Sequence, residues 1–266
     1  MSVTFKSNNI IKPWTILFLL IMVLCVLSVQ GQTRTIQQAM PFVPGEKLTY
    51  VLKWESIPAG KAVIEVLPVE TLNGEQAYHF VLTARTNSFV DIFYKVRDKI
   101  EGYTNLEITR SLFYKAKQRE GKYKRDIMVS FDWDKQEAQY TNFGKTRDPI
   151  PLLPGSLDPL SILFHVRLLD LGKTSQVTVP ITDGKRMING TVHVLKRETV
   201  KLSGKTYDTY LVEPETKGIG GVFKKSKNAK LYVWLTADER RIPVKVKSKV
   251  VVGSFTGELI SAEGLQ

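Results

Sequence analysis

The chain has 266 residues and a formal net charge of +12, because 38 Lys and Arg residues outnumber 26 Asp and Glu residues. It has one cysteine, Cys25, which excludes an intramolecular disulfide and a zinc site made of several thiolates. We predict neither a metal site nor a cofactor.

The first 31 residues have the pattern of a cleavable export signal. Lys6 and Lys12 give a basic start, residues 14–29 form an apolar run, and Gly31 places a small residue where a signal peptidase cuts. We therefore predict a periplasmic protein whose mature chain begins near Gln32. This compartment argues against a nucleic-acid partner.

Two other interpretations of the same segment stay open. An uncleaved membrane anchor needs roughly 20 apolar residues, and the run over residues 14–29 is shorter. Lipidation at Cys25 needs a small residue before the cysteine, but Leu24 occupies that position. Cleavage is the interpretation that we favour.

Residues 32–41 have no periodicity and are predicted to be a flexible lead-in to a single β-rich domain, residues 42–266. Alternation of apolar and polar residues is typical of strands. In the first part of the domain this alternation predicts strands over residues 48–54, 62–69, 78–86, 96–103, 106–119, 122–133 and 138–143. Pro149, Pro151 and Pro154 then interrupt the pattern and predict a linker or a surface crossing.

One segment breaks the β pattern. Asp158 suits a helix cap, Pro159 suits the first turn, and Gly172 suits the position after the last turn. The residues between them are apolar on nearly every side, which predicts a buried or lid-like helix over residues 159–171. We expect this helix to pack into the concave side of a curved sheet.

The strand pattern resumes after the helix. It predicts a long strand that ends at Leu202, a Gly- and Lys-rich loop at 216–226, and strands over residues 176–182, 207–213, 230–236 and 242–260. About a dozen strands joined by short turns predict a mainly β fold. The expected architecture is an antiparallel β roll or an incomplete barrel with one buried helix.

Several short motifs occur in an order typical of one bacterial family. They are PGEKLTY at residues 44–50, IPAGKA at 57–62, DPLS at 158–161, VWLTAD at 233–238, RIPV at 241–244, and GS at 253–254 with EL at 258–259. Over about residues 42–262 the chain resembles the bacterial domain-of-unknown-function family 3108. The resemblance implies an exported, mostly β protein of Gram-negative bacteria with no agreed activity, and it transfers no catalytic residues.

The histidines do not form a recognisable reactive group. His79, His165 and His193 lack the spacing of a helical metal site and adjoin no nucleophile motif. His165 is expected to be a partly buried histidine on the helix. We predict no catalytic residue among them.

Two other motifs could carry chemistry. Asp132 and Asp134 would lie on one face of a strand, about 7 Å apart, and could act on a sugar as an acid and a base. Their pattern is more typical of a turn, which we favour. The Gly218–Ser226 segment lacks the spacing of a phosphate-binding loop, although its lysines could meet an anion.

Two basic stripes alternate along predicted strands: Lys115, Lys117 and Arg119 in the first, and Lys245, Lys247 and Lys249 in the second. If the two strands are neighbours, the stripes merge into one field that attracts anions. If they are not, the stripes are separate solvated faces that keep the protein soluble. Together with Phe164 and Leu168 of the helix, these six residues are the candidate ligand-binding residues.

The sequence supports three hypotheses about function. The first is a non-catalytic periplasmic binding protein for an apolar or anionic envelope ligand, which is a lipid or a glycan. Such a protein could also contact a membrane peripherally. The second is an interaction or scaffold protein whose partners are envelope proteins. The third is a hydrolase of envelope glycan.

Overall fold

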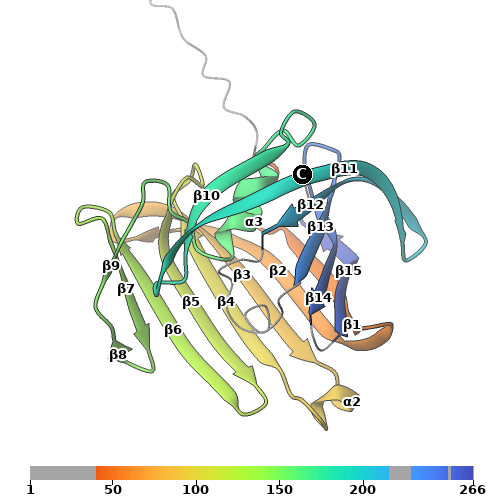
Figure 1. Cartoon of the computed structure of the whole chain (residues 1–266), viewed down its shortest axis with the longest axis horizontal. Coiled ribbons are helices and arrows are strands. Elements are labelled where there is room, and N and C mark those ends of the chain that lie inside the picture. The colour runs from red at the N-terminus through yellow and green to blue at the C-terminus, as the bar shows by residue number, and fades with distance from the viewer. Residues whose placement is uncertain (1–39, 216–228, 251–252, 266) are drawn as a thin grey trace, which may run out of the picture. The chain divides into compact units, whose positions relative to one another are not determined.

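One antiparallel sheet of fifteen strands makes up most of the fold, and two short helices accompany it in the described part of the chain (Figure 1). The computed structural model describes residues 40–215, 229–250 and 253–265. The predicted signal, most of the predicted lead-in and the Gly-rich loop lie outside these residues. The mainly β, antiparallel prediction is confirmed, and the sheet does not close into a barrel.

The strands in chain order are β1 (Lys47–Trp54), β2 (Ile57–Leu72), β3 (Glu75–Thr86), β4 (Arg97–Thr104), β5 (Ser111–Glu120), β6 (Tyr123–Asp132), β7 (Glu137–Asn142), β8 (Lys145–Thr146), β9 (Ile150–Pro151), β10 (Gln176–Thr182), β11 (Met187–Leu202), β12 (Lys205–Pro214), β13 (Lys230–Thr236), β14 (Pro243–Val250) and β15 (Gly253–Glu263). The helices are α2 (Ser88–Asp91) and α3 (Ser161–Arg167). In the described residues, no helix is long and apolar enough to cross a membrane.

The strand order follows the chain with two exceptions, of which one is the short strand β9, which pairs with β7. The order runs from β10 to β15, continues with β1, and ends at β8, so the last strand pairs with the first. The two sides of the sheet approach each other at Leu157, whose N–H donates to Pro180 O (2.9 Å) and whose carbonyl accepts from Thr182 N (2.9 Å). The preceding Ser156 carbonyl accepts from Ser111 N of β5 (3.0 Å), so one short segment links β5 to β10.

The β10–β11 turn packs on the inner face of β6 and β7. A Cβ at Gly184 would lie 2.7 Å from the Val129 side chain and 3.2 Å from Tyr140, and the Gly184 φ is +79°. Glycine is therefore required here for its conformation and for the close approach. Lys185, the next residue, lies 4.7 Å from the centroid of the Tyr140 ring.

Helix α3 is shorter than the predicted helix over residues 159–171. Asp158 does cap it, because its Oδ1 accepts from the backbone N–H of Leu160 (2.8 Å) and Ser161 (2.9 Å). The helix ends at Arg167 because the next N–H groups bond three residues back, Leu168 to His165 O and Leu169 to Val166 O. This tightening is typical of helix ends, and residues 168–171 lie outside the helix.

A buried ion pair fixes the end of α3. The Arg167 guanidinium donates to both carboxylate oxygens of Glu46, at 2.6 Å and 2.9 Å. It also donates to Pro41 O (3.0 Å) and to Arg240 O (3.1 Å), and it lies 4.9 Å from the Phe42 ring centroid. Since both charges are paired and hydrogen-bonded, their burial is tolerated.

Two segments between strands also differ from the prediction. The predicted strand over residues 106–119 begins only at Ser111, because the Asn105 side chain accepts from the N–H groups of Thr109 and Arg110 and closes a turn. In the predicted surface crossing, Ile150–Pro151 forms a short strand against β7.

We predict that Arg167→Met lowers the free energy of unfolding by about 3–5 kcal/mol, because it leaves the Glu46 carboxylate buried without its partner. Chemical denaturation monitored by circular dichroism measures the loss. Adding Glu46→Leu should recover most of it, because an apolar pair of similar volume replaces the ion pair.

The matched control for this experiment is Arg197→Met. Arg197 and Asp208 form an ion pair whose side chains are 58% and 51% exposed, against 1% and 2% for Arg167 and Glu46. Exposed pairs add little stability, so this variant should unfold like the wild type. Equal losses in Arg167→Met and Arg197→Met would contradict the importance of the buried pair.

Candidate functional site

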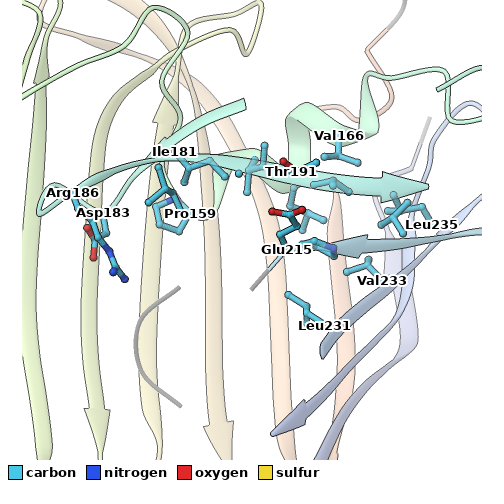
Figure 2. Close-up of a pocket in the computed structure, with 17 residues that line it drawn as sticks. Pro159, Val166, Ile181, Asp183, Arg186, Thr191, Glu215, Leu231, Val233 and Leu235 are labelled. Atoms are coloured by element: carbon cyan, nitrogen blue, oxygen red, sulfur yellow. The ribbon is translucent and has the colours of Figure 1, made fainter. Parts of the chain in front are cut away.

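An apolar cavity of about 380 Å³ lies between α3 and strands β10–β13, at the place where the predicted helix was expected to cover the sheet. It is partly open to solvent. Figure 2 shows its lining side chains. They are Pro159, Ile162, Leu163, Val166, Ile181, Asp183, Arg186, Ile188, Gly190, Thr191, Val192, Val212, Pro214, Glu215, Leu231, Val233 and Leu235.

The lining follows from the periodicity of the elements that supply it. Alternate residues of a strand point to the same face, and the cavity is lined by Ile188, Gly190 and Val192 of β11 and by alternate residues 231, 233 and 235 of β13. Along α3, Ile162 and Val166 are one helical turn apart and face the same side. The concave face of the sheet and one face of the helix therefore enclose the hollow.

Charged residues occur at only a few places in the lining. Asp183 and Arg186 lie together at one end of the cavity, away from Val233 and Leu235 (Figure 2). Glu215 also lines it, and its Oε1 lies 3.1 Å from His193 Nε2. The cavity thus offers an apolar interior with a cation and carboxylates at its border.

Two predicted ligand residues are placed elsewhere. Phe164 is fully buried on the other face of α3, where its ring stacks on Phe80 with the centroids 3.6 Å apart. Leu168 packs partly buried against the same core cluster. The alternate residues of β11 and β13, which line the cavity, were not singled out from the sequence, although their period-two apolar pattern carried the signal.

The two basic stripes do not merge. Strand β5 carries Lys115, Lys117 and Arg119, and β14 carries Lys245, Lys247 and Lys249. Strands β15, β1, β2, β3 and β4 lie between them in the sheet. The interpretation that neighbouring strands join the stripes is therefore wrong.

One lysine of each stripe lies on an aromatic ring. Lys115 Nζ is 5.2 Å from the Phe113 ring centroid, and Lys245 Nζ is 5.1 Å from that of Trp234. Such cation–π contacts stabilise a lysine on a sheet surface. Neither stripe contributes to the lining of the cavity.

The histidines have local partners. His165 Nδ1 bonds to Ile108 O (2.9 Å), as expected of a satisfied histidine on the helix. His79 lies between Glu70 (2.8 Å) and Glu101 (3.2 Å), and burial lowers its pKa while both carboxylates oppose that shift. In the described ranges, no group of three or more potential ligands is placed to hold a metal ion.

Asp132 belongs to a turn. Its Oδ1 accepts from the backbone N–H of Lys135 (2.9 Å), and its Oδ2 lies 3.1 Å from Lys135 Nζ. The backbone hydrogen bond from Lys135 and the interaction with its ammonium hold the pKa of Asp132 below its usual range. A carboxyl with a lowered pKa is a poor general acid, so this geometry favours the turn interpretation over sugar chemistry.

One other carboxyl has a strongly shifted pKa. The pKa of Glu120 is raised to about 7, mainly by burial and also by the neighbouring Asp98 carboxylate, while a hydrogen bond with Tyr94 acts in the opposite direction. The carboxyl lies at the β5–β6 turn, and Gln118 Nε2 also donates to it at 3.2 Å. It does not line the cavity.

The comparisons with known proteins give a family and a fold. The family model described as "Protein of unknown function (DUF3108)" matches residues 49–260. No curated protein matches the chain. A β-barrel-like protein of the domain of unknown function DUF1849 from Brucella abortus has a similar structure, with a TM-score of 0.53 at 11% identity, over 83% of this chain and 98% of that one.

Two further structures are more distant. One is a protein from Bacteroides fragilis described as exported, with a YmcC-like fold, at 8% identity over 84% of this chain and 98% of that one. The other is described as a lipoprotein, from Parabacteroides distasonis, at 12% identity over the same shares. Both TM-scores are 0.34, which is too low to establish a shared fold.

We predict that Glu120→Gln stabilises the protein above neutral pH. The pKa of Glu120 is raised in the folded state, so the folded state binds a proton more tightly than the unfolded state, and its contribution to stability is lost as the pH rises from about 4.5 to about 7. Denaturation at several pH values should show a higher unfolding midpoint for Glu120→Gln at about pH 8 and convergence near pH 5. The exposed Glu239 provides the control, because Glu239→Gln should follow the wild type at every pH.

Proposed function

The chain belongs to the DUF3108 family, whose function is unknown, and we propose that it is a non-catalytic binding protein that holds an apolar or amphipathic molecule between α3 and strands β10–β13. The cavity of about 380 Å³ is the observation that supports this proposal. Small-molecule sites are typically apolar hollows of about 300–1,000 Å³ with a few polar groups that orient the ligand. The cavity has both properties.

The chemistry of the lining favours a lipid-like ligand over a glycan. Ile162, Val166, Val192 and Val233 offer no hydrogen bond to a sugar hydroxyl, and burying such a hydroxyl without a partner is costly. An acyl chain or another apolar group gains free energy on the same surface. Arg186, at the border, supplies a guanidinium for an anionic head group.

The compartment is part of the proposal. The export signal predicted over residues 1–31 would place the protein in the periplasm, where envelope lipids provide molecules with an apolar body and a charged head. A protein of this kind would take up such a molecule and shield it from water. It would need no reactive residue. Asp132 and Asp134, the candidates for sugar chemistry, do not line the cavity.

We predict that Val192→Phe weakens the binding of a fluorescent apolar probe, N-phenyl-1-naphthylamine, by about tenfold or more, because the added ring fills space that the probe needs. A fluorescence titration of the purified protein measures the change. Val69→Phe is the matched control, since Val69 is exposed at the far end of β2 and does not line the cavity. Equal probe affinity in wild type, Val192→Phe and Val69→Phe would contradict a site in the cavity.

A second experiment addresses the natural ligand. The protein is isolated from the cells that naturally produce it. The intact protein is measured by native mass spectrometry, and an organic extract of the same sample is analysed alongside. A stoichiometric added mass that moves into the organic phase supports a lipid-like ligand and gives its class. An added mass that stays in water and carries sugar would overturn the lipid assignment.

A further inference from the structure

A group of exposed aromatic side chains marks one end of the sheet. In the described part of the chain the exposed aromatic residues are Trp54, Phe89, Phe93, Tyr94, Tyr123, Phe143 and Phe255, which we call the aromatic rim. The exposed aliphatic residues Ile57 and Ile92 accompany them. Large aromatic side chains are normally buried, so their gathering on one surface needs an explanation.

The strand register places these residues at the same end. Trp54 ends β1 and pairs with Ile57 at the start of β2 and with Phe255 near the start of β15. Residues 89–94 connect the end of β3 to the start of β4, and Tyr123 begins β6. Phe143 follows the end of β7, whose last residue Asn142 pairs with Ile127 in the first half of β6. Figure 1 shows these turns along the lower edge of the molecule, with α2 among them.

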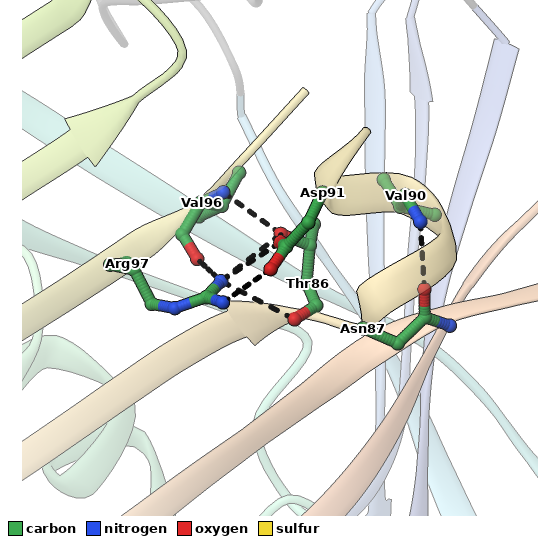
Figure 3. A network of polar contacts seen from close by, with 6 residues as sticks. All are labelled: Thr86, Asn87, Val90, Asp91, Val96 and Arg97. Atoms are coloured by element: carbon green, nitrogen blue, oxygen red, sulfur yellow. Dashed lines mark hydrogen bonds and ion pairs between the residues drawn. The ribbon is translucent and has the colours of Figure 1, made fainter. Parts of the chain in front are cut away.

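A polar network holds the α2 part of the rim in place (Figure 3). Asn87 Oδ1 caps α2 by accepting from Val90 N (2.9 Å), and Asp91 forms a two-point ion pair with Arg97 at 3.0 Å and 2.5 Å. Thr86 Oγ1 donates to Asp91 and accepts from Val96 N (2.9 Å). The backbone on both sides of Phe89, Ile92 and Phe93 is therefore fixed while these side chains are 60%, 75% and 75% exposed.

The β5–β6 turn is attached to the same segment. Gly121 N donates to Lys95 O (2.8 Å), and the Tyr94 ring lies so close that a Cβ at Gly121 would be 3.0 Å from it. Val96 and Glu120 form a β-bridge beside this contact. The exposed side chains of the two turns therefore belong to one surface, whose backbone segments are joined by hydrogen bonds.

The rim segments carry most of the net positive charge of the protein. Residues 53–61, 85–97, 117–126, 142–148 and 247–255 contain fourteen Lys and Arg but five Asp and Glu, an excess of nine positive charges. The whole chain has an excess of twelve. Lys122 and Lys124, on either side of Tyr123, are both exposed.

We propose that the aromatic rim docks the protein on the surface of a lipid bilayer that carries anionic head groups. Trp and Tyr side chains favour the boundary between head groups and acyl chains, and Phe and Ile side chains insert their apolar area just below it. Lysines and arginines beside them attract anionic lipid. This inference rests on the rim alone and does not depend on the cavity.

A bilayer fits this surface better than a protein partner does. The apolar side chains stand on separate turns with basic residues between them, whereas the centre of a protein interface is depleted in charge. A fluid lipid surface adapts to separate protrusions and supplies negative charge to every lysine. The charge excess is the property that selects the lipid surface over a second copy of this chain, which would bring the same positive charge.

The test is sedimentation with vesicles of phosphatidylcholine alone or mixed equally with phosphatidylglycerol. The protein isolated from the cells that produce it should bind the anionic vesicles. Its affinity for them should fall as salt is added. Ile92→Ser with Phe93→Ser should weaken binding about tenfold or more. These side chains are largely exposed, so the variant should fold, and its unfolding midpoint verifies this.

Matched controls separate the rim from other surfaces. Leu153→Ser with Leu195→Ser removes two exposed apolar side chains outside the rim and should leave vesicle binding unchanged. Lys122→Glu with Lys124→Glu should weaken binding, whereas Lys201→Glu with Lys205→Glu changes the charge equally at the β11–β12 turn and should weaken it less.

Three outcomes would overturn the proposal. The first is equal binding to neutral and anionic vesicles. The second is unchanged binding by the Ile92→Ser, Phe93→Ser variant. The third is self-association of the wild type in analytical ultracentrifugation that this variant abolishes, with no vesicle binding by either protein; that result would assign the rim to contacts between copies of the chain.

Discussion

The ion pair between Arg167 and Glu46 determines how the interior of this protein is organised. It joins three parts of the chain that are far apart in sequence: the segment before β1, the end of α3 and the turn before β14, where Arg240 O accepts from the guanidinium. The Arg241 side chain returns the contact by donating to Arg167 O (3.2 Å). A charge in a core is stable only with its partners in place, so the position of α3 inside the sheet is tied to the other two segments and allows little variation.

The fixed position of α3 accounts for the two kinds of surface around it. Phe164 points into a packed aromatic cluster with Phe42 and Phe80. Ile162 and Val166 face strands β11–β13, where they pack in a second apolar cluster and line the hollow. A helix of seven residues is about 10 Å long, and one element of this length cannot fill the concave side of a fifteen-stranded sheet. The hollow that remains beside the second cluster is a consequence of this mismatch in size.

The sequence predicted the local structure better than the arrangement of its parts. Period-two alternation predicted most strands, and the Asp158 cap predicted where α3 begins, because both are short-range effects. The environment at the end of α3 could not be predicted, since the partners of Arg167 there are at residues 46 and 240, far away in the sequence. The separation of the two basic stripes depends on the pairing of β15 with β1, which no local pattern reports. Residues that line the cavity carried an apolar alternation, but the same alternation also describes strands that pack tightly. A charged residue at the end of an apolar helix, and a glutamate just before the first strand, were signals that could have suggested the buried pair.

The pairing of the first strand with the last has a consequence for how the chain acquires its structure. Strand β1 lies between β2 and β15, and its contacts with β15 join residues about two hundred positions apart, such as Leu48 with Ala262. During synthesis, one edge of β1 stays unpaired until the final residues of the sheet arrive. Such long-range pairing is slow because the intervening chain must be ordered first. An open strand edge in the meantime is a template for pairing with other chains. The sheet can therefore be completed only after the last strand has been synthesised. A chain that lost this strand would expose a strand from the middle of the sheet, not one from its edge.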